Sequence, residues 1–118
     1  MVIPAMVRKK IVIIDDEQDL CHLMKRYFVE LDYDVFLANT LGTGLDLMKE
    51  VVPDVLFLDN NLPDGLGWDR MNFLVKNYPE CKINLISAYK YSPPNLAAET
   101  GVKIIEKPLS LSALRNYL

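Results

Sequence analysis

Five short apolar runs, separated by segments with helical spacing, constrain the fold more than any other feature of the chain. The runs are Ile11–Ile14, Val35–Ala38, Val55–Leu58, Ile83–Ile86 and Val102–Ile105. The first is an unbroken series of β-branched residues, which is typical of a strand buried on both faces. The resulting order (βα)5 predicts an α/β fold, a doubly wound parallel sheet with right-handed crossovers and helices on both faces.

The segments between the runs carry apolar residues that would share one helix face. These are Leu20, Met24, Tyr27, Phe28 and Leu31 after the first run, Leu41, Leu45 and Met48 after the second, and Met71, Leu74, Val75 and Tyr78 after the third. Between Tyr89 and Thr100, two consecutive prolines interrupt any helix, so we predict a mobile segment with about one to two helical turns at most. Ser110 or Ser112 can cap a last helix that runs through Leu118.

Length and composition bound the class of protein. The 118 residues suit one compact domain, and we assign residues 1–118 to it, with 1–7 as an N-terminal extension and no effector domain. The net charge of −3 and the lack of a basic block argue against direct nucleic-acid binding. No apolar stretch approaches the ~20 residues of a membrane span, and there is no signal-peptide pattern. Cys21 and Cys81 match no disulfide framework, so we expect free thiols in the reducing cytoplasm.

Polar residues stand at the ends of four of the five runs. Asp15 and Asp16 follow the first run, Asp59 the third, Ser87 the fourth, and Glu106-Lys107 the fifth. If the strand order is 2-1-3-4-5, these runs are neighbours and their carboxyl ends, where ligands bind in such sheets, meet at one place. Each residue alone has a plainer explanation, because Asp59 could close an Asx-turn and Lys107 could be solvated. Their occurrence at matching positions favours a shared site.

The residue types at these positions point to a metal and a phosphoryl group. Three carboxylates in one place repel one another unless a cation lies among them. Oxygen ligands suit Mg²⁺, or Mn²⁺ in its place, and a lysine ammonium suits a phosphoryl group. We take His22 and Cys21 as structural residues outside this site.

In order and spacing, these residues resemble the response-regulator receiver domains of two-component signal transduction, and the resemblance covers nearly the whole chain. The matching elements are Asp15-Asp16, Asp59 within the stretch Leu58–Gly65, Ser87-Ala88, and Lys107-Pro108. The resemblance implies a flavodoxin-like sandwich with a five-stranded sheet of order 2-1-3-4-5. It also implies a cis peptide bond between Lys107 and Pro108.

The resemblance further implies a phosphorylation switch. Asp59 would accept a phosphoryl group from a sensor histidine kinase or a phosphotransfer protein. Mg²⁺ would be bound directly by Asp16, Asp59 and the main-chain carbonyl of Asn61, with Asp15 acting through water. Whether such a domain counts as an enzyme stays open, because it would catalyse only its own phosphorylation and dephosphorylation.

The same resemblance assigns the readout of the switch. Lys107 would pair with phosphoryl oxygens, and Ser87 would supply the switch hydroxyl. The change would reach an output domain or protein through the face of the fourth helix, fifth strand and fifth helix, and it could produce a homodimer. Ile104 stands where the family usually has an aromatic residue, so we expect the backbone of Tyr89–Pro94 to carry the signal. Leu66 also departs from the family, which commonly has an acidic residue there.

Three other functions share parts of this pattern. A haloacid-dehalogenase-type phosphatase also uses an aspartyl nucleophile after a strand, but it needs a second Asp where this chain has Asn61. A flavodoxin-like FMN carrier needs a hydroxyl-rich phosphate loop, whereas the acidic residues 15–17 would repel a phosphate. A receiver fold that only docks to proteins, without phosphorylation, stays open as the third alternative.

Overall fold

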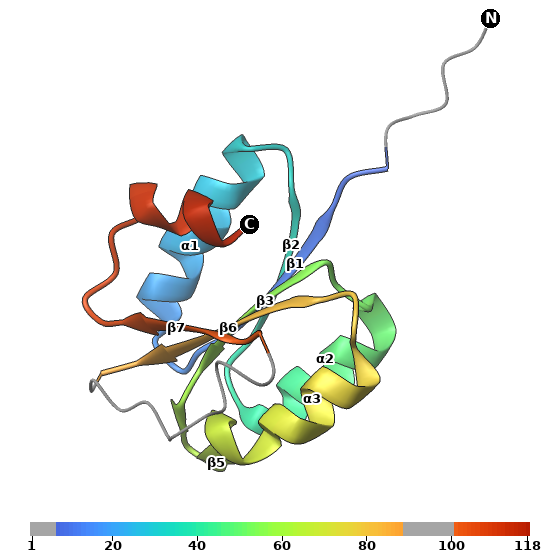
Figure 1. Cartoon of the computed structure of the whole chain (residues 1–118). Helices are drawn as coiled ribbons and strands as arrows, with labels where there is room; N and C mark the ends of the chain where they lie inside the picture. The colour runs from blue at the N-terminus through green and yellow to red at the C-terminus, as the bar shows by residue number, and fades with distance from the viewer. Residues whose placement is uncertain (1–6, 89–100) are drawn as a thin grey trace, which may run out of the picture.

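The computed structural model of the chain describes residues 7–88 and 101–118 (Figure 1). Its elements, in chain order, are β1 (Lys10–Ile14), α1 (Gln18–Glu30), β2 (Asp34–Ala38), α2 (Leu41–Val51), β3 (Val55–Asp59), β4 (Asn61–Leu62), β5 (Gly65–Leu66), the 3-10 helix η1 (Gly67–Arg70), α3 (Met71–Asn77), β6 (Lys82–Ser87), β7 (Lys103–Glu106) and the 3-10 helix η2 (Ser112–Tyr117). None of the helices in these two ranges is long and apolar enough to cross a bilayer.

The five long strands form one parallel sheet of order β2-β1-β3-β6-β7. Counting only these strands, the order is 2-1-3-4-5, which confirms the predicted doubly wound topology. Helices α2 and α3 cover one face of the sheet, and α1 and η2 cover the other (Figure 1). The arrangement places β1 and β3 in the centre, so that the strands leading to Asp15 and Asp59 are covered on both faces.

Burial of alternate side chains on the two faces fixes these central strands. In β1, Val12 and Ile14 join the core under α2 and α3, while Ile11 and Ile13 join the core under α1, and all four are fully buried. On the α1 side, the rings of Phe28 and Phe57 stack with their centroids 5.2 Å apart. A fully buried side chain of this kind stabilises the fold by about 1.5–3 kcal/mol, so the site rests on rigid elements.

The helices α1 and α2 agree with the predicted apolar faces. In α1, Met24 and Phe28 are fully buried, and the predicted neighbours Leu20, Tyr27 and Leu31 are partly buried at its border. At the start of α2, the Thr40 hydroxyl accepts a hydrogen bond from Thr43 N at 3.2 Å. Gly44 is buried against β1, where an added Cβ would lie 2.5 Å from Ile14 Cδ1. The close approach of α2 to the sheet therefore depends on a residue without a side chain.

Two predicted helices differ from the structure. The helix expected from Gly67 onward begins as η1 and continues as the seven-residue α3. The helix expected through Leu118 is wrong in type, because residues 112–117 form a 3-10 helix with i to i+3 bonds such as Leu114 N to Leu111 O at 3.1 Å. The Ser110 and Ser112 hydroxyls contact each other at 3.2 Å, and neither caps this helix.

The loop after Asp59 is more ordered than its turn-rich sequence predicts. It contains a small antiparallel hairpin in which Asn61 pairs with Leu66 and Leu62 pairs with Gly65. The short helix predicted between Tyr89 and Thr100 lies outside the described residues.

Candidate functional site

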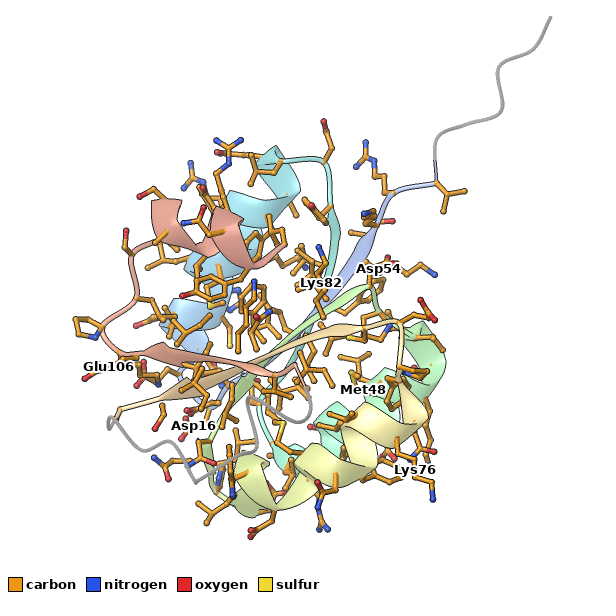
Figure 2. All side chains as sticks on the ribbon, in the orientation of Figure 1. Asp16, Met48, Asp54, Lys76, Lys82 and Glu106 are labelled. Atoms are coloured by element: carbon orange, nitrogen blue, oxygen red, sulfur yellow. The ribbon has the colours of Figure 1, made fainter. Side chains whose placement is uncertain are left out.

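The candidate site lies at the carboxyl edge of the sheet. Asp15 directly follows β1, Asp59 is the last residue of β3, Ser87 is the last residue of β6, and Lys107 directly follows β7. Since β1, β3, β6 and β7 are neighbours in the sheet, these residues converge as predicted. Figure 2 labels Asp16 near this edge, and Lys82 and Asp54 at the opposite one.

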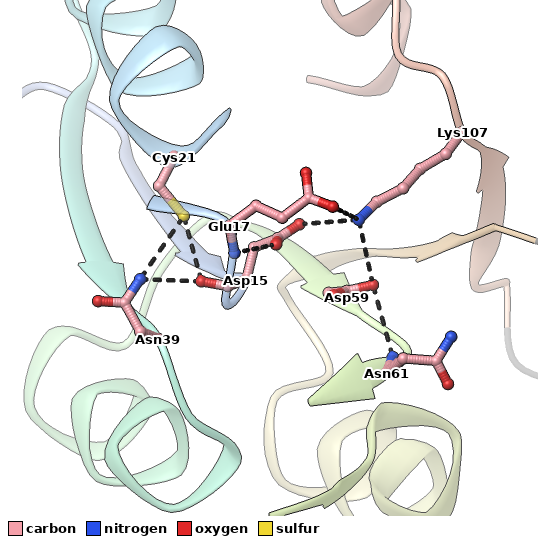
Figure 3. A network of polar contacts seen from close by, with 7 residues as sticks. All are labelled: Asp15, Glu17, Cys21, Asn39, Asp59, Asn61 and Lys107. Carbon is pink, nitrogen blue, oxygen red and sulfur yellow. Dashed lines mark hydrogen bonds and ion pairs between the residues drawn. The ribbon is translucent and has the colours of Figure 1, made fainter. Parts of the chain in front are cut away.

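The Lys107 ammonium is shared among three carboxylates (Figure 3). Its Nζ lies 3.4 Å from Glu17 Oε1, 3.6 Å from Asp15 Oδ2 and 3.7 Å from Asp59 Oδ1. The sequence predicts the grouping of Lys107 with Asp15 and Asp59. The contact between Lys107 and Glu17 was not predicted, although the run of three acidic residues at positions 15–17 could have indicated it.

Burial and crowding leave this pocket with excess negative charge. Asp15 and Asp59 are 0% and 3% exposed. Burial, followed by the negative charge of Asp15, raises the pKa of Asp59 to about 6 against the opposing effect of Lys107. Burial also raises the pKa of Asp15. For Lys107, burial lowers the pKa, but the charges of Asp15, Asp59 and Glu17 together outweigh this effect and raise it.

The donor atoms of the pocket fit a divalent cation. Asp15, Asp16 and Asp59 each offer a carboxylate oxygen, and these oxygens lie within 4.8 Å of one another. Asp15 Oδ2 is buried and accepts no hydrogen bond from the described part of the chain. Its sister atom Oδ1 accepts the Glu17 main-chain N–H at 2.9 Å, which fixes the orientation of the carboxylate. A buried anionic oxygen without a donor, beside two further carboxylates, suits the hard cation Mg²⁺.

Backbone bonds hold the loop that follows Asp59. Asn60 N donates to Ile86 O at 2.8 Å, and Asn60 Oδ1 accepts a hydrogen bond from Trp68 N at 3.0 Å. Gly67 packs directly behind the site, because a Cβ at this position would lie 2.8 Å from the main-chain oxygen of Asp59. The loop therefore presents Asn61 from a fixed backbone, and Asn61 N itself approaches Asp59 Oδ1 at 3.5 Å.

A second carboxylate of this loop serves a structural purpose. Asp64 Oδ1 accepts a hydrogen bond from Leu41 N at 2.7 Å, and Asp64 Oδ2 accepts one from Gly42 N at 2.9 Å. Both donors belong to the first turn of α2, where N–H groups lack partners within the helix. These bonds lower the pKa of Asp64 and tie the loop to α2. The sequence gives no local signal for a cap that comes from 22 or 23 residues away.

The main chain beside Asp15 is also supported from other elements. The Asn39 side-chain amide donates to Asp15 O at 2.9 Å, and the Cys21 thiol contacts the same oxygen at 3.3 Å. Burial, followed by the charge of Asp15, raises the pKa of Cys21 to about 11, so the thiol keeps its proton. This agrees with the structural role expected for Cys21. Asn39 was missed, although it follows the second apolar run as Asp15 follows the first.

Ser87 and Lys107 are joined through their main chains. Lys107 N donates to Ser87 O at 2.9 Å, one step beyond the last paired residues of β6 and β7. Ser87 is 2% exposed. The Lys107–Pro108 bond is cis, as predicted. Ile104 takes the expected place in β7, partly buried against the core under α2 and α3.

Comparisons with known proteins agree with this geometry. Residues 11–118 match the family model described as the response regulator receiver domain. The chain is 28% identical to the response regulator protein PilR of Pseudomonas aeruginosa over 115 residues. This alignment covers 96% of this chain and 26% of PilR. It is 32% identical over 105 residues to the transcriptional regulatory protein YxdJ of Bacillus subtilis, covering 86% of this chain and 44% of YxdJ. The chain thus spans less than half the length of either relative.

The fold is shared with solved structures. The crystal structure of a CheY-like response regulator receiver domain protein from Methanospirillum hungatei superposes with a TM-score of 0.83 at 26% identity, covering 93% of this chain and 90% of that one. The residues that match the family model, 11–118, include Asp15, Asp59 and Lys107. The chain therefore belongs to the response regulator receiver domains of two-component systems.

Proposed function

We propose that Asp59 is the phosphoacceptor of this receiver domain and takes its phosphoryl group from a sensor histidine kinase or a phosphotransfer protein. The observation that carries the proposal is the position of Asp59 at the end of a central strand. It lies 3.7 Å from the Lys107 ammonium, and its carboxylate is grouped with those of Asp15 and Asp16. Asp15 has the same neighbours, but its Oδ1 already accepts the Glu17 main-chain N–H at 2.9 Å, whereas Asp59 Oδ1 has only the longer contact with Asn61 N at 3.5 Å. In such a transfer, an Asp59 oxygen forms the new O–P bond while the P–N bond of the phosphohistidine breaks, its electron pair remaining on the imidazole.

Asp16 and Asp59 would hold Mg²⁺, or Mn²⁺, directly together with the main-chain carbonyl of Asn61, and Asp15 would act through water. When bound, the ion supplies positive charge that offsets the phosphoryl oxygens. The protein supplies the rest. The hairpin β4–β5 and the contacts of Asn60 keep the Asn61 backbone in place. Because the pKa of Asp59 is about 6, its carboxylate is mostly ionised, and thus nucleophilic, at neutral pH.

Lys107 and Ser87 would read the modified state. Lys107 pairs with a phosphoryl oxygen, and the Ser87 hydroxyl donates to another once the end of β6 moves inward. The new charge then shifts a two-state equilibrium and alters the face that includes β7 and η2, which serves an output domain or protein, or a second copy in a homodimer. The cytoplasm is the compartment in which such a kinase would reach the domain.

The experiment is intact-mass spectrometry after incubation with acetyl phosphate and Mg²⁺. One phosphoryl group should add to the wild type and none to Asp59→Asn. Asp46→Asn is the matched control, since this exposed carboxylate lies on α2 and away from the sheet edge. Equal labelling of the wild type and Asp59→Asn would reject Asp59 as the acceptor. An unlabelled wild type would favour the alternative of a docking module that is not phosphorylated.

A further inference from the structure

Glu17 is the exposed member of the group that surrounds Lys107. The Lys107 ammonium hydrogen-bonds Glu17 Oε1 at 3.4 Å, whereas its distances of 3.6 and 3.7 Å to Asp15 and Asp59 are ion pairs only. The Glu17 side chain is 60% exposed, and those of Asp15 and Asp59 are 0% and 4% exposed. Lys107 therefore lies between two buried carboxylates on one side and a solvent-facing carboxylate on the other.

The position of Glu17 just before α1 has a simpler explanation, namely that an acidic residue favours a helix N-terminus. The contacts of its side chain do not support this as its main role. Glu17 makes no side-chain cap bond to α1. Its carboxylate instead meets a lysine 90 positions further along the chain. The Glu17 main-chain N–H meanwhile donates to Asp15 Oδ1, so the backbone of Glu17 is fixed to the site.

We propose that Glu17 is a positioning residue that holds Lys107 at the outer side of the pocket, beyond hydrogen-bond distance of the buried carboxylates, until Asp59 is phosphorylated. The inference rests on the proposed phosphorylation of Asp59. In the unmodified site, Glu17 gives the ammonium a partner outside the pocket and leaves oxygens of Asp15 and Asp59 for a cation. In the modified site, the phosphoryl group must draw Lys107 away from Glu17.

This arrangement gives Glu17 two opposite effects. Its negative charge adds to the attraction of the acidic pocket for Mg²⁺, and its hydrogen bond to Lys107 keeps this competing cation beyond hydrogen-bond distance of the ligand oxygens. The same charge repels an incoming phosphoryl donor and competes with the phosphoryl group for Lys107. Loss of the charge should therefore weaken metal binding and speed phosphorylation. A general folding defect would impair both.

The test compares Glu17→Gln, which keeps the shape and removes the charge, with Asp19→Asn. Asp19 is an exposed acid in the first turn of α1, and it is not among the carboxylates that pair with Lys107 in the described part of the chain, so it controls for net charge at this end of the helix. Calorimetric titration should show Mg²⁺ affinity reduced about three- to tenfold in Glu17→Gln. At saturating Mg²⁺, acetyl phosphate should label Glu17→Gln about two- to fivefold faster than the wild type, by intact mass. Asp19→Asn should change either quantity less than about twofold.

A second background isolates the role of Lys107. With Lys107→Met already present, Glu17→Gln should accelerate labelling less than it does in the wild-type background, because only the repulsion of the donor is then relieved. An undiminished acceleration would overturn the positioning role in favour of a charge effect alone. Wild-type Mg²⁺ affinity in Glu17→Gln, or slower labelling at saturating Mg²⁺, would also overturn it. If the wild type itself takes no phosphoryl group, the proposed function fails, while the Mg²⁺ titration still decides whether Glu17 keeps Lys107 away from the metal ligands.

Discussion

Two aspartates five residues apart in the chain, Asp59 and Asp64, lie in opposite electrostatic environments. Asp59 ends a buried strand beside another buried carboxylate, and burial raises its pKa to about 6. Asp64 lies in the exposed loop that follows, accepts two main-chain N–H groups of α2, and has a lowered pKa. The fold therefore gives one carboxylate all the donors it needs and leaves the other short of them. A carboxylate that is poorly compensated in the resting protein is available for a cation or a phosphoryl group, whereas a satisfied one stabilises the loop.

Mg²⁺ should give the largest change in stability, and it should act only through the pocket of Asp15, Asp16 and Asp59. At about 100 times its Kd, Mg²⁺ should add about 2.7 kcal/mol to the free energy of unfolding. Asp16→Asn should lose most of this gain, because Asp16 is the exposed carboxylate proposed to touch the ion directly. Asp15→Asn should retain more of it. Thermal unfolding with and without Mg²⁺ measures both variants, and a full Mg²⁺ effect in Asp16→Asn would reject the proposed ligand set.

Asp59→Asn should stabilise the metal-free protein at pH 7 by about 1–3 kcal/mol, since it removes a buried carboxylate whose pKa is raised to about 6. The sign follows from linkage. A carboxyl with a raised folded-state pKa favours the fold when protonated, and that stability is lost as the pH rises through about 6. The advantage of the variant should therefore vanish below about pH 4. Urea unfolding at pH 7 and pH 4 tests this, and a destabilised variant at pH 7 would contradict it.

Asp64→Ala should give the smallest change and the opposite sign. It leaves Leu41 N and Gly42 N without their acceptor, so the variant should unfold at lower urea concentration at pH 7. Asp64→Asn keeps one acceptor oxygen, so its urea midpoint should lie between those of Asp64→Ala and the wild type. Because the pKa of Asp64 is lowered, its contribution is present above the ordinary pKa of an aspartate and is lost as the pH falls through the lowered value. Asp69→Ala, an exposed acid in η1, is the control. Identical unfolding of all these proteins would remove Asp64 from the comparison.

The features that sequence analysis predicted are those with a local signal. Each strand is a short apolar run, and the polar residue that follows it must lie at the carboxyl edge of a parallel sheet. That rule alone brought Asp15, Asp59, Ser87 and Lys107 to one edge. The parallel order of the central strands then follows from topology, since crossovers between them are right-handed.

The features that it missed depend on contacts between distant segments. The bond from Lys107 to Glu17 spans 90 positions, and the bonds from Leu41 and Gly42 to Asp64 span more than 20. The hairpin β4–β5 involves only two residues in each strand, too few for a periodic pattern. The type of η2 likewise depends on hydrogen bonds of the last turn, which the serines at positions 110 and 112, predicted as caps, did not indicate.

The main-chain hydrogen bond between Lys107 N and Ser87 O couples the positions of two residues of the site. The two side chains proposed to read the phosphoryl group sit on one continuous ladder of peptide groups that ends in this bond. A substitution that displaces the end of β6 must therefore also displace the main chain of Lys107. The positions of the hydroxyl and of the ammonium are thus coupled through the backbone, whereas the Glu17 carboxylate approaches Lys107 from the segment between β1 and α1 and is not part of this ladder.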